Sequence, residues 1–518
     1  MKKLLSLFAI TLVLAACGTS KSKNATSKTK TPADPTKYAE TITAEDLKTA
    51  LYIYAGDAFE GRETGKEGQK MAVEFIKEHY IEDGIPAAKS DGNYFQDVPL
   101  VVMAVPDVKL SINGKSFTNV EDYVSVSSSK DAILNAKDVV FAGYGIEDEN
   151  YSNYKDLDVK GKVVVIRSGE PKNADGNYVI SGTSESSKWS NMRQAFASKQ
   201  EVAKSKGAKA LLFYYPEVYT MAANRYGRSS GRMNLADGAE DMMYMLINTD
   251  LAKALVSDID TNENSMSVKS DVAITYKNNS ENVSSENVAA IIKGSEKPNE
   301  YIIISAHLDH EGIKDGKVYN GADDDGSGTV AILEIAEAFA KAKKDGHGPK
   351  RSIVFLNVTG EEKGLLGSRH YTDNDPIFPL ADTVADLNID MIGRTDPKRE
   401  KKNRNYVYLI GSDRLSTELH DISEAMNTKY MNIDLDYTFN DENDPNRYYF
   451  RSDHYNFAKN NIPVIFYFNG THDDYHQPGD TPDKIQYDLL ENRTRLVFYT
   501  AWELANREAR ITVDKVLE

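Results

Sequence analysis

Between residues 284 and 518 the sequence alternates short apolar runs with longer amphipathic stretches. The runs 288–292, 301–305, 352–358, 384–389, 406–410 and 464–468 predict strands, and the stretches 327–342, 365–371, 416–427 and 489–508 predict helices. This alternation is typical of an α/β fold, in which helices cover both faces of a mostly parallel mixed sheet. Ligand sites in such folds gather at the carboxyl ends of the strands, so polar residues that follow a strand are candidates for a site.

The residues before this segment predict two further parts of the chain. Residues 39–116 predict two helices and a strand, and we expect them to form one domain with residues 284–518. Residues 117–283 predict short strands at 139–146, 162–167 and 208–214 and a helix at 192–206. This order is similar to a protease-associated domain, mainly through Gly143-Tyr144-Gly145 and Lys206-Gly207-Ala208. We therefore expect 117–283 to be a smaller inserted α+β domain.

The N-terminus has the pattern of an export signal. Lys2 and Lys3 precede an apolar run, 4–16, which is too short to span a bilayer but is typical of a secretory signal. Residues 14–18 (Leu-Ala-Ala-Cys-Gly) resemble the lipobox of bacterial lipoproteins, in which the cysteine is diacylated. Cys17 is the only cysteine of the chain, which favours an acyl acceptor over a disulfide partner. We expect a lipoprotein signal peptide at 1–16 and an exported protein of the bacterial cell envelope, anchored to a membrane on its periplasmic or cell-surface side.

Residues 17–38 are rich in Ser, Thr and Lys and predict a flexible tether.

Composition excludes several other classes of protein and of metal site. The formal net charge of -17 argues against nucleic acid as a partner, because binding to phosphates needs a basic face. With a single cysteine at the export signal, the folded part has no thiolate for a metal site, so histidines and carboxylates are the available ligands.

Histidine and carboxylate residues lie at five places between 284 and 518, four of them after a predicted strand and one in a turn before a predicted helix. They are His307 and Asp309; Asp323, Asp324 and Asp325; Glu361 and Glu362; Asp390; and Asp474, His476 and Asp480. Each group alone has an ordinary explanation as a helix cap, an acidic turn or a surface pair. Together, at strand ends of one α/β domain, they form a nitrogen and oxygen ligand set that suits zinc.

The order of these motifs resembles the dizinc aminopeptidase family of zinc metallopeptidases. The motifs are His-x-Asp, Gly-Ala-Asp-Asp-x-x-Ser-Gly, Glu-Glu-x-Gly-Leu-x-Gly-Ser, Asp-Met-x-Gly and His-x-Pro-x-Asp-Thr. Residues 59–65 (Phe-Glu-Gly-Arg-Glu-Thr-Gly) also resemble the N-terminal signature of that family. The family includes bacterial leucine aminopeptidases and, more distantly, glutamate carboxypeptidase, glutaminyl cyclase and the transferrin receptor.

The resemblance implies a metal centre with two zinc ions per chain. One ion would be held by His307 and Asp390, the other by Glu362 and His476, and Asp324 would bridge both. The implied fold is that of a zinc exopeptidase.

The resemblance also implies the catalytic residues. Glu361 would be the general base towards a metal-activated water. Asp309 would orient His307, since alternation in an extended run places its carboxylate on the same side as the imidazole. Tyr448 and Tyr449 are candidate oxyanion donors, although packing is an equally good explanation in a chain with 30 tyrosines. Residues 452–454 (Ser-Asp-His) cannot converge as a triad from one turn, which favours a supporting role.

These features predict a secreted, lipid-anchored aminopeptidase that acts on peptides. A carboxypeptidase or dipeptidase of the same fold is the alternative, since its pocket needs cations for a terminal carboxylate whereas an aminopeptidase needs acids for the α-amine. Arg394, Arg404, Arg447 and Arg451 are candidates for the first, and Asp441, Glu442 and Asp444 for the second. A glutaminyl cyclase, with one zinc, and a non-catalytic peptide-binding lipoprotein are both disfavoured by the complete ligand set.

Overall fold

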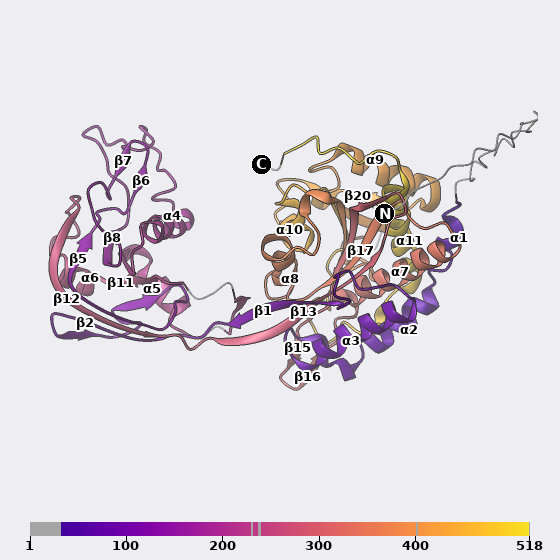
Figure 1. The fold of residues 1–518 in the computed structure, drawn as a ribbon, viewed down its shortest axis with the longest axis horizontal. Coiled ribbons are helices and arrows are strands. Elements are labelled where there is room, and N and C mark those ends of the chain that lie inside the picture. Colours follow the sequence, from indigo (N-terminus) through magenta and orange to yellow (C-terminus); the bar gives the residue numbers. More distant parts are fainter. Residues whose placement is uncertain (1–32, 229–230, 237–239, 400–401, 517–518) are drawn as a thin grey trace, which may run out of the picture. The chain divides into compact units, whose positions relative to one another are not determined.

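The computed structural model describes residues 33–228, 231–236, 240–399 and 402–516 (Figure 1). The predicted signal peptide and Cys17 lie outside the described residues, so the export signal and the lipid anchor stay predictions. The end of the predicted tether, residues 33–38, lies within the described part of the chain, and its residues 36–38 pack against the folded domain instead of forming a free linker. The short helix α1 (Thr36–Ala39) buries Tyr38, whose ring stacks on Trp502 with centroids 5.6 Å apart. Among the described residues, no helix is both long enough and apolar enough to cross a membrane.

A nine-stranded sheet carries the motifs singled out above. Its order is β10-β1-β13-β17-β14-β18-β21-β19-β20. The strands are β1 (Phe95–Val102), β10 (Met233–Leu235), β13 (Glu281–Ile292), β14 (Lys297–His307), β17 (Arg351–Val358), β18 (Thr383–Ile389), β19 (Tyr406–Ile410), β20 (Asp434–Asp436) and β21 (Val464–Phe468). The central strands β17, β14, β18 and β21 are parallel, as are β19 and β20, and the remaining pairs are antiparallel. The predicted α/β fold with a mixed sheet is therefore confirmed, with parallel pairing concentrated at its centre.

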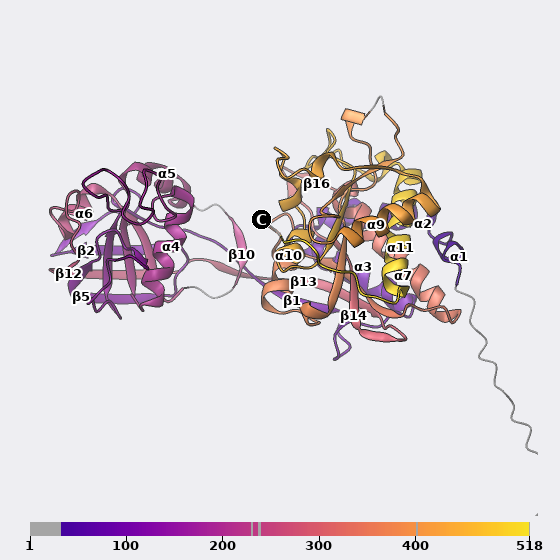
Figure 2. The ribbon, with the colours of Figure 1, turned by 90° about the horizontal axis from the view of Figure 1, so that it is seen from above.

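Helices cover both faces of this sheet, as predicted. One face packs against α7 (Gly328–Lys344) and α11 (Tyr487–Asn506), which in turn contact α2 (Ala44–Tyr54), α3 (Glu67–Glu82) and α9 (Thr417–Met426). The other face packs against α10 (His454–Ala458), which in turn contacts α8 (Leu366–Arg369). Figure 1 shows α7 and α11 on one side of β17 and α8 and α10 on the other, and Figure 2 shows the helices from above. The start of α2 follows its sequence signal, since Thr43 accepts a hydrogen bond from the backbone N–H of Asp46.

A second, eight-stranded sheet has the order β3-β2-β12-β5-β8-β9-β11-β4. Its strands are β2 (Asp107–Ile112), β3 (Lys115–Phe117), β4 (Tyr123–Ser125), β5 (Ala132–Phe141), β8 (Val163–Arg167), β9 (Ala210–Tyr214), β11 (Met243–Ile247) and β12 (Met266–Lys277), and the helices of this part are α4 (Met192–Ser205), α5 (Pro216–Tyr226) and α6 (Thr249–Leu255). Separate apolar clusters lie on its two faces. The sheet begins before the boundary predicted at residue 117, because β2 pairs with β12. The division into domains and the likeness to a protease-associated domain stay predictions.

The strand predicted at 139–146 ends earlier in the structure. β5 stops at Phe141, and Gly143 and Gly145 both have positive φ. A Cβ on Gly143 would lie 2.5 Å from Nδ2 of Asn153, so the turn needs glycine there. The glycines that suggested a continuing strand instead end it.

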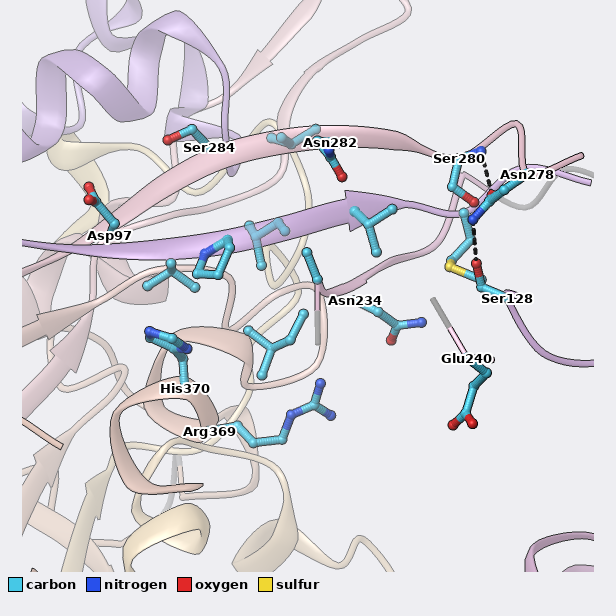
Figure 3. Close-up of a pocket in the computed structure, with 18 of the residues that line it drawn as sticks. Asp97, Ser128, Asn234, Glu240, Asn278, Ser280, Asn282, Ser284, Arg369 and His370 are labelled. Atoms are coloured by element: carbon cyan, nitrogen blue, oxygen red, sulfur yellow. Dashed lines mark hydrogen bonds between the residues drawn. The ribbon is translucent and has the colours of Figure 1, made fainter. Parts of the chain in front are cut away.

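The chain leaves the nine-stranded sheet along β1 and returns along β13. All eight residues of β1 pair antiparallel with β13, from Phe95 opposite Val288 to Val102 opposite Glu281. Figure 3 shows Asp97 on β1 and Asn282 and Ser284 on β13 along this ribbon. The backbone N–H and C=O groups of the two strands hydrogen-bond to each other, so the nine-stranded sheet stays paired although a long segment of chain is inserted between β1 and β13.

Candidate metal centre

The predicted ligands come together at one edge of the nine-stranded sheet. His307 is the last residue of β14, and Asp390 directly follows β18. Glu362 follows β17, and His476 follows β21. Because these four strands are parallel, their carboxyl ends lie at the same edge of the sheet. The strand pattern thus explains how residues more than 160 positions apart meet.

Asp324, in the turn before α7, lies at the centre of the group. Its Oδ1 is 3.1 Å from Nε2 of His307, and its Oδ2 is 3.1 Å from Nε2 of His476. Its side chain is almost completely buried. Each oxygen therefore faces a different histidine, which is the arrangement that a bridging carboxylate needs.

The other two carboxylates complete two half-sites. Oδ1 of Asp390 lies 3.6 Å from Nε2 of His307, and Oε2 of Glu362 lies 3.0 Å from Nε2 of His476. The structure thus groups the five residues into the two sets predicted from the motifs, which share Asp324.

Several buried atoms of this group show that it suits a cation. Nε2 of His307, Oδ2 of Asp324 and Oε1 of Glu362 are buried and make no hydrogen bond within the described residues, although polar atoms lie close by. Buried polar atoms are almost always paired, so atoms that converge without hydrogen-bond geometry point to a missing partner. Nitrogen and carboxylate oxygen donors without sulfur fit zinc, and the residues present therefore fit the implied metal.

Charge at the site leads to the same conclusion. Burial by itself lowers the pKa of His476, but the neighbouring carboxylates of Asp324 and Glu362 raise it to about 10. Without a metal, the carboxylates therefore hold a proton on this imidazole. A divalent cation would satisfy the same negative charge.

Glu361 lies beside the metal ligands and lines a cavity with Asp324 and Asp390. Burial raises the pKa of the Glu361 carboxyl well above its usual range, and the nearby carboxylates of Glu362 and Asp390 raise it further. A carboxyl group in this setting is suited to hold and release a proton. The neighbouring residues Glu361 and Glu362 thus lie in different environments.

Asp309 contacts His307 differently from the prediction. Nδ1 of His307 donates to the backbone carbonyl of Asp309 at 3.0 Å, while the nearest carboxylate oxygen is 4.0 Å away. The carboxylate instead accepts hydrogen bonds from Oγ1 of Thr64 (2.6 Å) and from the backbone N–H of Glu361 (3.2 Å). The reason is that β14 ends at His307, so strand alternation does not extend to residue 309. A carbonyl can only accept, so Nδ1 carries the proton and Nε2 is left to bind a metal.

The two candidate tyrosines lie in different places. Tyr448 lines the cavity beside Glu361, and its hydroxyl is 3.5 Å from Oγ1 of Thr471. The ring of Tyr449 packs edge-on against His454, with centroids 5.5 Å apart, and lines a separate cavity. The structure thus brings Tyr448 to the site and leaves Tyr449 away from it.

Tyr475 was missed by the sequence analysis. Its ring stacks on His476 with centroids 3.9 Å apart, and it lines the same cavity as Glu361. Its position next to a predicted ligand was the only available signal.

The Ser-Asp-His run supports the site and does not form a triad. Oγ of Ser452 donates to Oδ2 of Asp390 at 2.6 Å and accepts from Nδ2 of Asn388 at 2.9 Å. The ring of His454 stacks on Phe466, with centroids 4.7 Å apart, and burial lowers its pKa to about 3. This imidazole does not act as a base for Ser452, because a pKa of about 3 makes it too weak a base and the Ser452 hydroxyl donates to Asp390 rather than to a His454 nitrogen.

The aspartates on either side of Asp324 hold the backbone of the site. Asp325 accepts hydrogen bonds from the backbone N–H groups of Gly328 (2.8 Å), Met391 (3.2 Å) and His307 (3.3 Å). Its carboxylate therefore ties together the ends of β14 and β18 and the start of α7.

Asp480, from the last motif, supports the turn from the other side. It accepts hydrogen bonds from the backbone N–H groups of Asp323 (3.0 Å) and Asp324 (3.1 Å). This contact explains why an aspartate four residues after His476 belongs to the motif.

The charged residues considered for substrate selection lie in different places in the structure. Arg451 lines the cavity beside Glu361. Arg394 pairs with Asp474 at 3.1 Å, and Arg404 pairs with Asp488 at 2.6 Å. Another cavity is lined by Arg447, Asp441, Glu442 and Asp444. Of the seven candidates, Arg451 is the one that lies at the cavity next to the metal ligands.

Comparison with known proteins supports the sequence motifs. Residues 287–501 match the sequence profile of Peptidase family M28, and this range contains the five predicted ligands and Glu361. The predicted similarity to the dizinc aminopeptidase family is thereby confirmed for this segment.

Curated relatives match over short segments. The chain is 36% identical to "Probable glutamate carboxypeptidase LAMP1" of Arabidopsis thaliana over 105 residues, which cover 20% of this chain and 14% of that protein. It is 35% identical to "Aminopeptidase NAALADL1" of Mus musculus over 123 residues, which cover 24% and 16%. The chain thus spans less than a fifth of the length of these relatives.

Among solved structures, an aminopeptidase from Aneurinibacillus sp. strain AM-1 aligns with 20% identity and a TM-score of 0.46. That alignment covers 94% of this chain and all of the other.

Proposed function

We propose that this chain is a zinc metallo-exopeptidase of the M28 type that removes N-terminal residues from peptides. The observation that carries the proposal is the position of Asp324. Its two carboxylate oxygens face His307 and His476, and Asp324 and Glu361 line the same cavity. Aminopeptidase and carboxypeptidase names both occur among the relatives, so the choice between them rests on the residues of this chain.

The ligand set holds two zinc ions in this proposal. His307 and Asp390 would hold one, Glu362 and His476 would hold the other, and Asp324 would contact both. When bound, two such ions polarise the scissile carbonyl and lower the pKa of the attacking water. The complete set counts against a one-zinc glutaminyl cyclase and against a non-catalytic binding protein.

Glu361 serves as the general base and then as the general acid. Its carboxylate takes a proton from the attacking water and passes it to the leaving amine. Asp309 holds its backbone in place through the 3.2 Å hydrogen bond to the Glu361 N–H. The raised pKa of Glu361 favours keeping the proton until the amine departs.

The cavity wall supplies the contacts to the substrate. Tyr448 has a hydroxyl whose contact with Thr471 is long, at 3.5 Å, so it is available to donate to the developing oxyanion. Met391, Phe466 and Phe468 form the apolar part of the wall and suit an apolar side chain at the cleaved end.

A carboxypeptidase or dipeptidase is the second candidate, and Arg451 favours it. Its guanidinium lies 4.9 Å from the centroid of the Tyr448 ring and 3.4 Å from the Tyr475 hydroxyl. Among the described residues no carboxylate forms an ion pair with it. A cation in the wall of the cavity suits a substrate that carries a carboxylate.

Export and lipid anchoring at Cys17 complete the proposal. They are supported by the charged start, the short apolar run and the position of the single cysteine. Labelling of the expressed protein with a radioactive fatty acid tests this, since a Cys17→Ser variant should lose the label. Equal labelling of both proteins would reject the anchor.

The function is tested with the full chain and small substrates. Leucyl and alanyl chromogenic amides are compared with an N-blocked peptide that has a free C-terminus, each with and without chelator. Chelator-sensitive release from the free-amine substrates supports an aminopeptidase. Cleavage of the N-blocked peptide alone supports the carboxypeptidase, and no turnover on any of them with zinc bound rejects both.

A further inference from the structure

We propose that His310 is a further ligand of the metal bound by Glu362 and His476. This metal is then held by four side chains, whereas the metal bound by His307 and Asp390 is held by three. The inference rests on the proposed function in taking this group as a dimetal site.

His310 is fixed firmly at the centre of the site. It lies three residues after the end of β14, and its backbone N–H donates to the carbonyl of Arg62 at 3.2 Å. The side chain is fully buried. A Cβ on Gly321, which has φ of +57°, would lie 2.4 Å from Cγ of His310, so the imidazole packs directly against this glycine backbone. The ring position is therefore set by the fold on both sides.

The nitrogen Nδ1 of His310 points into the second half-site. It lies 2.8 Å from Oε1 of Glu362 and 3.8 Å from Oδ2 of Asp324. Both of its ring nitrogens are buried without a hydrogen bond in the described structure. Nε2 of the predicted ligand His307 shows the same pattern, 3.1 Å from a carboxylate oxygen and without a hydrogen bond. A cation between nitrogen and oxygen atoms satisfies them where direct hydrogen bonds do not.

His310 and His476 occupy different sides of the same half-site. His476 faces Oε2 of Glu362 at 3.0 Å, whereas His310 faces Oε1. The two ring centroids are 5.8 Å apart and the ring planes meet at 72°. Both imidazoles therefore reach the carboxylates without excluding each other.

This assignment makes the two half-sites unequal. Four protein ligands fill a tetrahedral zinc site, as in structural sites, while catalytic sites keep an open position. Asp390, from the three-ligand site, lines the cavity together with Asp324 and Glu361. Glu362, His310 and His476 do not line it. The first site is thus open to substrate, and the second is expected to bind its metal more tightly.

A thiolate at position 310 tests direct ligation. In the full chain, Cys17→Ser removes the natural cysteine, so His310→Cys provides the single thiol. The metal-free protein is titrated with Co²⁺, and ligation is expected to give a near-ultraviolet thiolate-to-cobalt charge-transfer band that saturates with the tighter ion. His79→Cys on the same background is the matched control, because His79 lies on α3 and contacts the carbonyl of Phe75. Absence of the band in His310→Cys, with two ions bound, overturns the assignment.

Metal affinity gives an independent measurement. His310→Ala is expected to weaken the tighter of the two zinc sites by at least roughly tenfold in competition with a chromogenic chelator, because a direct ligand contributes no less than a residue that orients one. An unchanged affinity in a folded variant, checked by circular dichroism, overturns the proposal. If His310→Cys gives the thiolate band but the parent chain shows no chelator-sensitive hydrolysis, His310 is a metal ligand and the proposed peptidase function is rejected. If the parent chain hydrolyses the substrates but His310→Cys gives no band, the peptidase function stands and the assignment of His310 is rejected.

Discussion

The hydroxyl of Ser452 donates a 2.6 Å hydrogen bond to Oδ2 of Asp390, while the other carboxylate oxygen, Oδ1, faces His307. One oxygen is thus occupied by the protein and the other is left for a metal. Hydrogen bonds of this kind orient a ligand and set how many of its oxygens bind.

Removing this hydroxyl is expected to weaken the first metal site. Ser452→Ala should lower zinc affinity there by roughly 10- to 100-fold, as typical for the loss of a partner that orients a ligand. Zinc titration of the metal-free protein measures it, with activity restored at high zinc. Ser270→Ala is the matched control, since Ser270 is also buried but lies on β12. Equal affinities of Ser452→Ala and the parent chain would contradict the interpretation.

The neighbours Glu361 and Glu362 are expected to separate catalysis from metal binding. Glu361→Gln should lower kcat by roughly 10²- to 10⁴-fold, the range for loss of a general base, and keep two zinc ions. Glu362→Gln should lose one ion, because its carboxylate lies within 3.0 Å of His476. Metal analysis beside steady-state kinetics makes the comparison. Loss of metal from Glu361→Gln would show that the two roles are assigned the wrong way round.

Arg451 is expected to select for a carboxylate on the substrate. Arg451→Met should raise KM roughly tenfold for substrates with a carboxylate, in line with the loss of a hydrogen bond to a charged group, and leave leucyl amides unchanged. Two comparisons show which carboxylate of the substrate Arg451 contacts. Dipeptides and their C-terminal amides differ in the terminal carboxylate, and glutamyl and glutaminyl amides differ in the side-chain carboxylate. Arg447→Met, which changes the separate cavity, serves as the control. A uniform loss on all substrates would mean that Arg451 supports the fold of the site instead.

Glu334 on α7 is expected to make stability depend on pH. Burial, together with the nearby carboxylates of Glu337, Asp46 and Asp83, raises the pKa of Glu334 to about 8. Because the folded pKa lies above the ordinary value of 4.5, the stabilisation is complete below about pH 4.5 and is lost as pH rises through 8. Glu334→Gln should therefore be more stable than the parent chain at pH 9, by up to about 5 kcal/mol, since the pKa moves from 4.5 to about 8 and each pKa unit corresponds to about 1.4 kcal/mol.

Urea unfolding of the metal-free proteins at pH 4 and pH 9 measures this difference. Glu78→Gln, at an exposed position of the neighbouring helix α3, should show none. A gain for Glu334→Gln that is equally large at pH 4 would point to packing rather than to ionisation.

The sequence by itself determined the α/β sheet and the approximate place of every predicted ligand. The strands at 406–410 and 464–468 match β19 and β21 residue for residue, because short apolar runs of aromatic and β-branched residues between polar turns are a local signal. His307 and Asp390 follow from the same signal, since they lie where β14 and β18 end.

Only the tertiary structure decided which atoms face the site. Beyond a strand end the alternation of side chains no longer holds, so Asp309 contacts His307 through its carbonyl rather than its carboxylate. Met391 and His476 have φ of 57° and 54°, a left-handed geometry that a strand pattern cannot indicate. The choice of Tyr448 over Tyr449 likewise depends on contacts between distant segments.

The second histidine of the His-x-Asp-His run illustrates the same limit. His310 is next to Asp309 in the sequence, but no local pattern shows that it contacts Glu362. That contact arises because β14 and β17 are neighbouring strands of the sheet. Local patterns determine where a chain bends and which residues lie at the bends. Which of those residues meet depends on strand order and on packing between segments, such as the packing of the His310 ring against Gly321. These contacts exist only in the folded chain.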